Sequence, residues 1–274
     1  MAYRLCIEPN SLKQNYRRPA VPSSNDMKNK IIAIRRDVRY SLDAEQKDRE
    51  ILASVIQCLG GDIPMIDEAQ LSDEHKADVY LSMGRLPATL KFLRKRAAAG
   101  ALVINTPKAV EACERKNIVK LMRTHHIPMP PEKGEHGYWL KRGDALAQRD
   151  SDVVFCQDED ELRKQKDEWE KRGILTCVES ANVEGDLVKF YCVGHDFFRW
   201  YRLHAAEQGY AFDANELHRH ACRLADIIGI DVFGGDCIVS EDGHFCIIDF
   251  NDWPSFSPCR AEAAQAIAQL LKEV

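Results

Sequence analysis

Oxygen-bearing side chains interrupt two apolar stretches near the C-terminal end of the chain. Asp236 precedes the run C-I-V, and Asp249 and Asn251 follow the run F-C-I-I. Asp249 and Asn251 are two residues apart, so on one strand both side chains face the same side. Asp236 lies opposite them if the turn at 240–243 closes a hairpin. Such side chains would repel one another without a cation between them, and magnesium prefers carboxylate and amide oxygens together with substrate phosphates. The sequence therefore predicts a magnesium site that meets nucleotide phosphates.

Two lysines stand within apolar strand-like segments. Lys141 ends the aromatic run Y-W-L-K, and Lys189 lies in D-L-V-K-F-Y-C-V-G. A buried ammonium group needs an anion as its partner, so either lysine is a candidate phosphate ligand. Either could equally be a surface lysine whose stem lies along apolar surface. Taken singly, both interpretations stay open.

Composition narrows the class of protein. With 274 residues, 45% of them apolar and 30% charged, the chain can bury one core or two. A net charge of -5 and a pI of about 6.0 lack the excess of Lys and Arg expected for a nucleic-acid partner. No stretch approaches the ~20 apolar residues of a membrane span, and the beginning lacks an apolar signal segment. We therefore expect a soluble cytoplasmic protein with neither a nucleic-acid nor a membrane partner.

Ten cysteines raise the question of disulfides or zinc. None forms a C-x-x-C pair, and most stand among apolar residues, where a free cysteine acts as a small buried hydrophobe. We expect reduced thiols in a reducing compartment.

The apolar pattern divides the chain into segments. Residues 1–27 show no period and indicate an irregular arm. From residue 28 to 107, short apolar runs alternate with helical stretches such as 42–61, which predicts a small parallel sheet covered by helices. The remainder is richer in strands, with a hairpin at 194–196 and a last helix beginning at 257–258.

Seven motifs follow one another in an order that resembles the ATP-grasp superfamily from residue 28 to the end. They are N-T-P-K-A-V-E-A-C-E-R-K, H-H-I-P-M-P-P, W-L-K, C-V-E-S, G-D-L-V-K-F-Y, G-G-D-C-I-V and I-I-D-F-N-D-W-P-S. No single motif is specific, and the resemblance rests on their order and intervals. It implies an α/β (α+β) fold in which a small parallel-sheet pre-ATP-grasp domain precedes the ATP-grasp subdomains. The segments expected are an arm at 1–27, the first domain at 28–107, and subdomains at 108–180 and 181–274.

The resemblance also implies ligands for ATP and for magnesium or manganese. Lys141 is similar to the strand lysine that contacts the nucleotide phosphates. Lys116 is similar to an earlier basic residue, a role that Arg115 takes if the following loop is one residue shorter. The remaining nucleotide contacts implied are the adenine hinge, Glu179, Ser180 and Ala181, and a ribose contact, Asp186. The implied metal ligands are Asp236, Asp249 and Asn251. The candidate catalytic residues are Lys189, Arg199, Arg202 and Arg260, the three arginines as holders of a reacting anion.

Three departures from the family pattern concern the substrate more than the nucleotide. The loop R-G-D-A-L-A-Q-R-D-S-D after Lys141 lacks the several glycines that many members fold over the phosphates. Asp249 stands where ligases more often have Glu. After Asn251, Pro254-Ser255 replaces the usual P-G.

The resemblance implies a ligase that activates a small-molecule or peptide carboxylate as an acyl phosphate for attack by an amine or similar nucleophile. The alternative is a kinase acting on a hydroxyl of a small polyol, since N-V-E-G-D-L-V-K-F-Y-C-V-G and Asp249 resemble the inositol phosphate kinases of this fold. A third hypothesis is a nucleotide-binding module without chemistry, which the glycine-poor loop favours. A homodimer is a family-based expectation.

Overall fold

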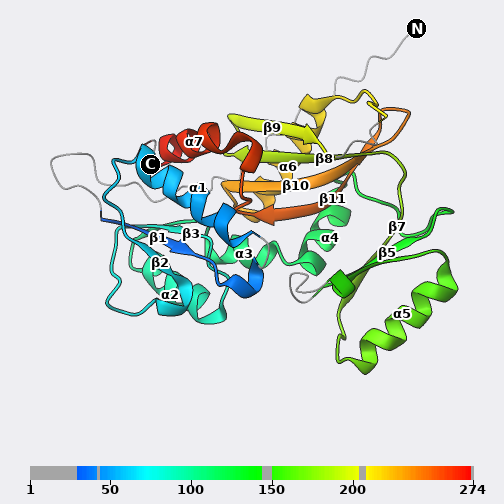
Figure 1. Cartoon of the computed structure of the whole chain (residues 1–274), viewed down its shortest axis with the longest axis horizontal. Helices are drawn as coiled ribbons and strands as arrows, with labels where there is room; N and C mark the ends of the chain where they lie inside the picture. The colour runs from blue at the N-terminus through cyan, green and yellow to red at the C-terminus, as the bar shows by residue number, and fades with distance from the viewer. Residues whose placement is uncertain (1–29, 42–43, 144–149, 204–207, 273–274) are drawn as a thin grey trace, which may run out of the picture.

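The computed structural model describes residues 30–41, 44–143, 150–203 and 208–272, arranged around three β-sheets (Figure 1). The N-terminal sheet is parallel, with strand order β2-β1-β3-β4. The central sheet is antiparallel, with order β11-β10-β8-β9, and the small sheet, also antiparallel, has order β6-β5-β7. The mixed α/β (α+β) class is thereby confirmed. The arm expected at 1–27 falls outside the described residues.

The parallel sheet is covered on both faces, as its nearly continuous apolar strands require. Alternate residues of β1 separate the two faces, since Ala33 packs with α1 while Ile32 and Ile34 join the core that also contains Leu93 of α2. The strands of this sheet are β1 (Ile31–Arg35), β2 (Met65–Asp67), β3 (Val79–Ser82) and β4 (Leu102–Ile104). The covering helices are α1 (Glu45–Cys58) and α2 (Pro87–Ala98), with 3-10 turns η1 (Val38–Tyr40) and η2 (Glu68–Gln70).

The C-terminal helix lies beside the helix that follows β1. Helix α7 (Arg260–Lys272) packs against α1, and both contribute to one apolar core with residues of β8 and β10 (Figure 1). Its start differs from the prediction, because Ser257 opens a 3-10 turn, η4 (Ser257–Cys259), and α7 begins only at Arg260. The Ser257 hydroxyl lies 2.9 Å from that of Ser255, so it does not cap the helix.

The central sheet carries the largest core. Phe190, Phe233 and Phe250 from three adjacent strands pack together on the face covered by α6. Helix α6 (Ala214–Ile228) begins where Asp213 accepts hydrogen bonds from two backbone N–H groups and ends at Gly229 with a φ of 76°. The strands are β8 (Asp186–Val193), β9 (Phe197–Arg202), β10 (Val232–Val239) and β11 (Phe245–Asp252). Two helices, α3 (Pro107–Ala112) and α4 (Arg115–Thr124), add residues to this core.

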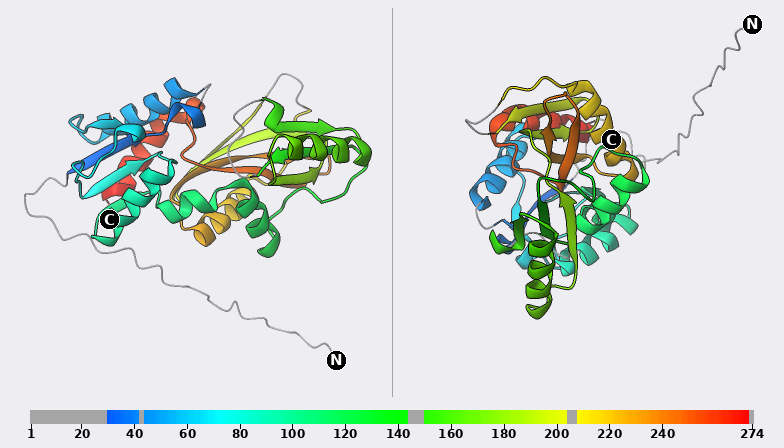
Figure 2. Two further views of the ribbon diagram at one scale, coloured as in Figure 1. Left: turned by 90° about the horizontal axis from the view of Figure 1, so that it is seen from below. Right: turned by 90° about the vertical axis from the view of Figure 1, so that its right-hand side faces the viewer.

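The small sheet lies at the end of the molecule opposite the parallel sheet (Figure 2). One of its faces packs on α5 (Glu159–Lys171) through a core that contains Leu140 and Trp169. The strands are β5 (Tyr138–Arg142), β6 (Val153–Cys156) and β7 (Cys177–Ala181), with a 3-10 turn η3 (Asp150–Asp152). Its second face, which carries Lys141, is free of α5.

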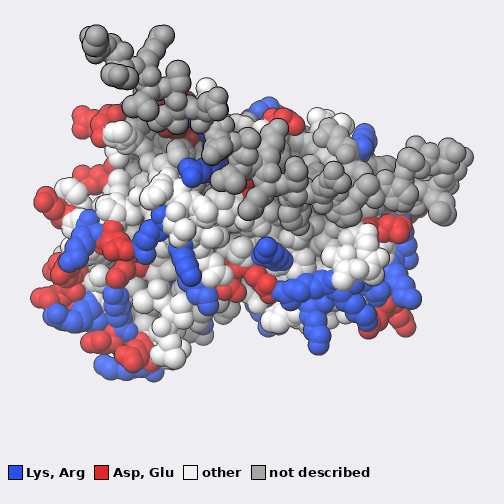
Figure 3. All heavy atoms as spheres, turned by 180° about the vertical axis from the view of Figure 1, so that it is seen from behind, with Lys and Arg blue, Asp and Glu red and all other residues white. Residues whose placement is uncertain are grey.

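Surface features agree with a mixed charge distribution. Acidic and basic side chains alternate over the face shown in Figure 3, and Lys and Arg gather near the end formed by the parallel sheet. All cysteines of the described residues are free, as expected from their sequence context. Within the described ranges, the helices are too short or too polar to cross a lipid bilayer.

Candidate nucleotide and metal site

Three charged residues form a row across the central sheet. Lys189 on β8, Asp236 on β10 and Asp249 on β11 are successive cross-strand partners, so their side chains share one face. The Lys189 Nζ lies 2.8 Å from Asp236 Oδ1. This metal row, defined as Lys189, Asp236, Asp249 and the neighbouring Asn251, unites residues up to 62 positions apart in sequence.

A β-bulge sets the end of this row. Asp236 pairs with Asp249 while Cys237 pairs with Ile247, so Ile248 is the extra residue of β11. A bulge bends the strand and turns the following side chain. The carbonyl of Ile248 accepts a hydrogen bond from Lys141 Nζ at 3.1 Å, which joins the small sheet to the free edge of the central sheet.

Asp249 is held as a carboxylate. Burial raises its pKa, but the positive charges of Arg115 and Lys141 and a hydrogen bond from Asn251 outweigh burial, so the pKa lies below its ordinary value. Asn251 Nδ2 donates to Asp249 Oδ2 at 3.1 Å, and the N–H of Phe250 donates to Oδ1 at 3.1 Å. The amide oxygen of Asn251 takes no part in either bond.

Asp236 is in the opposite electrostatic situation. Burial raises its pKa, and the nearby charge of Asp249 adds to this effect, while Lys189 lowers the pKa by less than these raise it. Two carboxylates that face each other in this way favour a divalent cation between them. Across the described ranges, no group of three or more His, Cys, Asp or Glu side chains is arranged to hold a metal ion. The candidate ligand set is two carboxylates and an amide, whose hard oxygens fit magnesium or manganese.

A narrow pocket adjoins the metal row at the edge of β11. Lys141 lies inside the pocket. Burial lowers the pKa of its ammonium group, and the nearby charge of Asp249 offsets part of this shift. Arg115 also lines the pocket and donates to the carbonyl of Arg142 at 2.7 Å. The remaining walls come from α4, the segment after it, β7 and β11: Ile118, Val119, Met122, Met129, Pro130, Val178, Glu179, Ser180, Ile247, Ile248, Asp249 and Phe250.

Arg115 and Lys116 occupy different surroundings although they are neighbours. Arg115 points into the pocket, whereas the Lys116 side chain is 47% exposed and lies 3.7 Å from Glu114. The structure therefore brings Arg115, the alternative left open in the sequence, to Lys141 and Asp249, and leaves Lys116 outside.

The expected adenine hinge is split by the structure. Glu179 and Ser180 line the pocket, and Glu179 also forms an ion pair with Lys166 of α5. Ala181 is buried, and its N–H donates to the carbonyl of Pro131 at 2.8 Å. Its backbone N–H is therefore already bonded within the protein.

Asp186 lies away from the pocket, contrary to the expected ribose contact. It stands three residues before Lys189 on β8, so it faces the other side of the sheet. Its buried carboxylate accepts from the backbone N–H groups of Gln208 and Tyr210 and from Arg202 Nε. Asp186 thus holds the segment at 208–210 in place.

The three arginines expected to hold a reacting anion are all engaged in ion pairs. Arg202 pairs with Asp186 at 3.2 Å on the face away from Lys189. Arg199 pairs with Glu262 of α7. Arg260 pairs with Glu50 of α1 at 2.7 Å. Of the two arginines on β9, only Arg199 shares the face of the metal row, because its partner on β8 is Tyr191, two residues from Lys189.

Two exposed aromatic rings were not assigned to the site from sequence. Trp139 lies two residues before Lys141 on β5, so both side chains are on the same face of the strand. The Trp139 ring packs on Phe155, with the ring centroids 5.4 Å apart. Trp139 Nε1 donates to Asn182 Oδ1 at 2.9 Å, just beyond β7. Their exposure, 36% and 40%, is unusual for large apolar side chains. Trp139 therefore lies on the Lys141 face of β5 without being among the residues that line the pocket.

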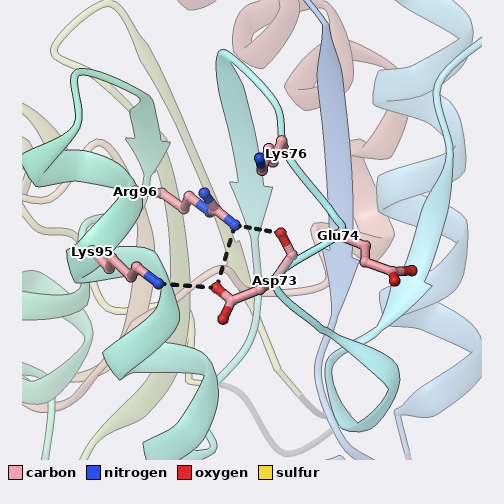
Figure 4. A pocket seen from close by; sticks show the side chains of 5 residues that line it. All are labelled: Asp73, Glu74, Lys76, Lys95 and Arg96. Atoms are coloured by element: carbon pink, nitrogen blue, oxygen red, sulfur yellow. Dashed lines mark hydrogen bonds and ion pairs between the residues drawn. The ribbon is translucent and has the colours of Figure 1, made fainter.

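A second hollow lies on the surface of the first domain and has a different character. Lys95 and Arg96 both reach Asp73, while Lys76 and Glu74 stand at its rim (Figure 4). Lys95 and Asp73 are largely solvent-exposed, so these pairs are weak surface interactions and not a built anion site. The glycine-poor loop expected to close over phosphates falls mainly on 144–149, outside the described residues.

Comparison with solved structures finds several similar proteins. A RimK domain protein ATP-grasp from Sphaerobacter thermophilus DSM 20745 is 15% identical, with a TM-score of 0.64 over 87% of this chain and 98% of that chain. The D-alanine–D-alanine ligase from Bacillus anthracis complexed with ATP is 13% identical, with a TM-score of 0.68 over 89% and 97%. The ATP-grasp ligase PsnB complexed with precursor peptide PsnA2 and AMPPNP is 13% identical, with a TM-score of 0.58 over 90% and 99%. No family model matches the sequence, and no curated protein does.

Proposed function

Because the chain has the ATP-grasp fold shared with ATP-dependent ligases, we propose that it is an ATP- and magnesium-dependent ligase. It activates the carboxylate of a small molecule or peptide as an acyl phosphate, which an amine or similar nucleophile then attacks. The observation that carries the proposal is the metal row, which places two facing carboxylates beside the pocket containing Lys141 and Arg115.

Asp236, Asp249 and Asn251 are the proposed ligands of magnesium or manganese. The metal, when bound, neutralises charge on the phosphates of ATP. Asp249, already ionised by its surroundings, needs no proton loss to bind it. Asp236 would hold the metal in place of its ion pair with Lys189, and the Lys189 ammonium group would then be available to contact the phosphoryl group.

Lys141 and Arg115 are the proposed contacts to the nucleotide phosphates, in place of Lys116. Both are cations that line the pocket, and burial of Lys141 strengthens charge–charge attraction there relative to open water. Glu179 and Ser180 line the same pocket and are proposed to border the adenine ring.

The reaction balances without a redox partner. A carboxylate oxygen attacks the γ-phosphorus of ATP, ADP leaves, and the acyl phosphate forms. The nitrogen of the amine then attacks the acyl carbon, phosphate leaves with the bonding electron pair, and the amine loses a proton. The side chains of the metal row and the pocket cations supply charge neutralisation and alignment, which are the main needs of phosphoryl transfer. The PsnB complex with a precursor peptide supports peptides as one class of acceptor to be tested here.

A kinase remains the second candidate because Asp249 stands where ligases more often have Glu. A kinase acting on a phosphorylated polyol needs unpaired basic residues near the acceptor. Four arginines at or near strand ends of the parallel sheet could supply such residues, and all of them contact carboxylates: Arg35 with Asp67 and Glu45, Arg36 with Asp48, Arg39 with Asp37, and Arg85 with Asp252. These ion pairs are evidence against a basic acceptor pocket formed by these four arginines. A non-catalytic nucleotide module is the weakest candidate, because both carboxylates of the metal row are retained.

The reaction products distinguish the ligase from the kinase. The protein is incubated with ATP, magnesium and panels of carboxylic acids, amino acids and short peptides, with and without hydroxylamine. A ligase releases ADP and free phosphate and yields a hydroxamate from the trapped acyl phosphate. A kinase forms ADP while phosphate stays on the acceptor. If no acceptor is turned over, calorimetry measures the binding of a non-hydrolysable ATP analogue, with and without magnesium, to the wild type and to Asp249→Ala. Magnesium-independent binding that survives the substitution would refute the proposed site.

A reducing compartment such as the cytoplasm is proposed for the protein, supported by the free cysteines of the described residues.

A further inference from the structure

The metal row lies on an edge strand that needs support. β11 has the central sheet on one side only, and it contains the bulge at Ile248 directly before Asp249. After Asn251 and Asp252, the backbone turns into the left-handed region at Trp253, with a φ of 41°. Such a conformation persists only where surrounding contacts hold it. The contacts that do so come from the first domain, through residues at the carboxyl ends of its parallel strands.

Arg85 holds the residue next to Asn251. Its Nη2 contacts both the carboxylate of Asp252 and, at 3.3 Å, the backbone carbonyl of the same residue. The two side chains are only 10% and 2% exposed. Arg85 follows β3 closely in sequence, so one arginine fixes the end of β11 to the parallel sheet.

Arg36 and Asn105 hold the next contacts. Arg36, directly after β1, donates from Nη2 to the carbonyl of Trp253 at 2.5 Å and pairs with buried Asp48 at 3.0 Å. Asn105, directly after β4, donates to the carbonyl of Val232 at 2.7 Å and accepts from its N–H at 3.0 Å. The start of β10 and the end of β11 are therefore tied to the same sheet edge.

Glu68 orders the loops that present the two arginines. It is 3% exposed and accepts hydrogen bonds from the backbone N–H groups of Asp37, Arg85 and Leu86, at 2.6, 2.8 and 2.7 Å. One buried carboxylate thus links the loop after β1 to the loop after β3. The backbone segments that carry Arg36 and Arg85 are therefore both held by hydrogen bonds to Glu68.

We propose that Arg85, through Asp252, is a positioning residue for the metal ligands Asp249 and Asn251, with Arg36 supporting it at Trp253. The inference rests on the proposed function, because it assumes that the metal row binds a cation. Residues that hydrogen-bond metal ligands typically change metal affinity by 10–100-fold when they are replaced. Arg85 acts one residue further along the chain, so we expect an effect at the lower end of this range. The nucleotide pocket is lined by α4, β5 and β7 as well as by β11, so nucleotide affinity without metal should change less than metal affinity.

The test uses the full chain and a pair of double variants. Arg85→Met with Asp252→Asn removes both buried charges together, since removing one would leave the other unpaired. The matched control is Arg94→Met with Glu111→Gln, which removes an exposed ion pair between α2 and α3. For each, Mn²⁺ binding in the presence of a non-hydrolysable ATP analogue is followed by electron paramagnetic resonance, and analogue binding in EDTA by calorimetry.

The expected result is Mn²⁺ affinity weakened by about tenfold or more in the Arg85/Asp252 variant alone, with a clearly smaller change in metal-free nucleotide affinity. Equal Mn²⁺ affinity in a folded Arg85/Asp252 variant and in the control would overturn the positioning role while leaving the proposed function intact. A wild type that binds neither Mn²⁺ nor nucleotide would overturn both. If the double variant does not fold, Arg85→Lys keeps the charge beside Asp252 but loses the planar donor group, and the same Mn²⁺ measurement decides.

Discussion

Asp236 and Asp249 stand directly opposite each other on β10 and β11, and the ammonium group of Lys189 lies 2.8 Å from Asp236 on the next strand. Like charges opposite each other on adjacent strands are unfavourable, so this arrangement needs compensation. Lys189 supplies one positive charge, and Lys141 and Arg115 add their fields at Asp249. A divalent cation at the proposed metal site would supply the further positive charge.

Replacing Asp249 by Asn should abolish magnesium-dependent nucleotide binding and lower turnover by at least about 100-fold, because a ligand charge disappears from the metal row. The fold should survive, since the amide keeps the shape of the side chain and the hydrogen bond with the N–H of Phe250. Calorimetry with a non-hydrolysable ATP analogue, at several magnesium concentrations, measures the effect.

Glu241→Gln is the matched control for this substitution, because it removes one exposed carboxylate from the turn that joins the same two strands. It should bind and turn over as the wild type does. Turnover by Asp249→Asn at the rate of this control would contradict the metal row.

Arg115→Met and Lys116→Met should differ sharply although they are adjacent. Arg115 lines the pocket beside Lys141, so its loss should weaken nucleotide binding by about tenfold or more, the usual effect of losing a charged hydrogen-bond partner. The Lys116 side chain is exposed and forms an ion pair with Glu114, so its loss should change little. Dissociation constants for ADP with magnesium test the pair. A larger effect at Lys116 would restore the original assignment from sequence.

The order of helices and strands was predictable because each local pattern agreed with the fold. Asp213 before a helical stretch and Gly229 after it mark α6 at both ends. The turn at 240–243 joins two strands whose lengths place Asp236 opposite Asp249. The bulge at Ile248 was not predictable, since nothing local distinguishes that isoleucine from its neighbour.

The site residues that differ from expectation have physical explanations. The choice between Arg115 and Lys116 depends on how the first turn of α4 is rotated, which tertiary packing of Ile118 and Met122 determines. The orientation of Asp186 was predictable from the sequence. It is three residues from Lys189 on one strand, and side chains at an odd spacing face opposite sides of the sheet. The contacts of Arg85 and Arg36 with residues 252 and 253 join segments far apart in sequence, which no local pattern reports.

Asp186→Asn separates a structural role from a role in ribose binding. The substitution leaves Arg202 without its carboxylate partner and replaces one acceptor of the backbone N–H groups at 208–210. The free energy of unfolding, measured with urea, should therefore fall. Nucleotide affinity should stay at the wild-type value, because the side chain faces away from the pocket. A selective loss of affinity for ATP, with stability retained, would instead support the ribose contact.

Two histidines of α6 should make the protein less stable in mildly acidic solution. Burial lowers the pKa of His218, with a smaller contribution of the same sign from His195 and an opposing one from Asp196. Burial likewise lowers the pKa of His220, where Glu216 opposes and Arg223 and Arg219 reinforce the shift. The neutral forms fit the folded state, in which His218 stacks on Phe198 at 4.5 Å.

The unfolded chain binds these protons with an ordinary pKa of about 6.5, above the folded values. The unfolded state therefore binds more protons between the two pKa values, and the free energy of unfolding falls as the pH drops through 6.5 toward the folded values. Well above pH 6.5 both states keep these histidines neutral, so the histidines add no pH dependence to the free energy of unfolding there. Urea unfolding of the wild type and of His218→Phe with His220→Gln, at pH 8, 7, 6 and 5.5, measures the slope. The double variant should show a flatter profile below pH 7, and identical slopes would assign the acid sensitivity to other groups.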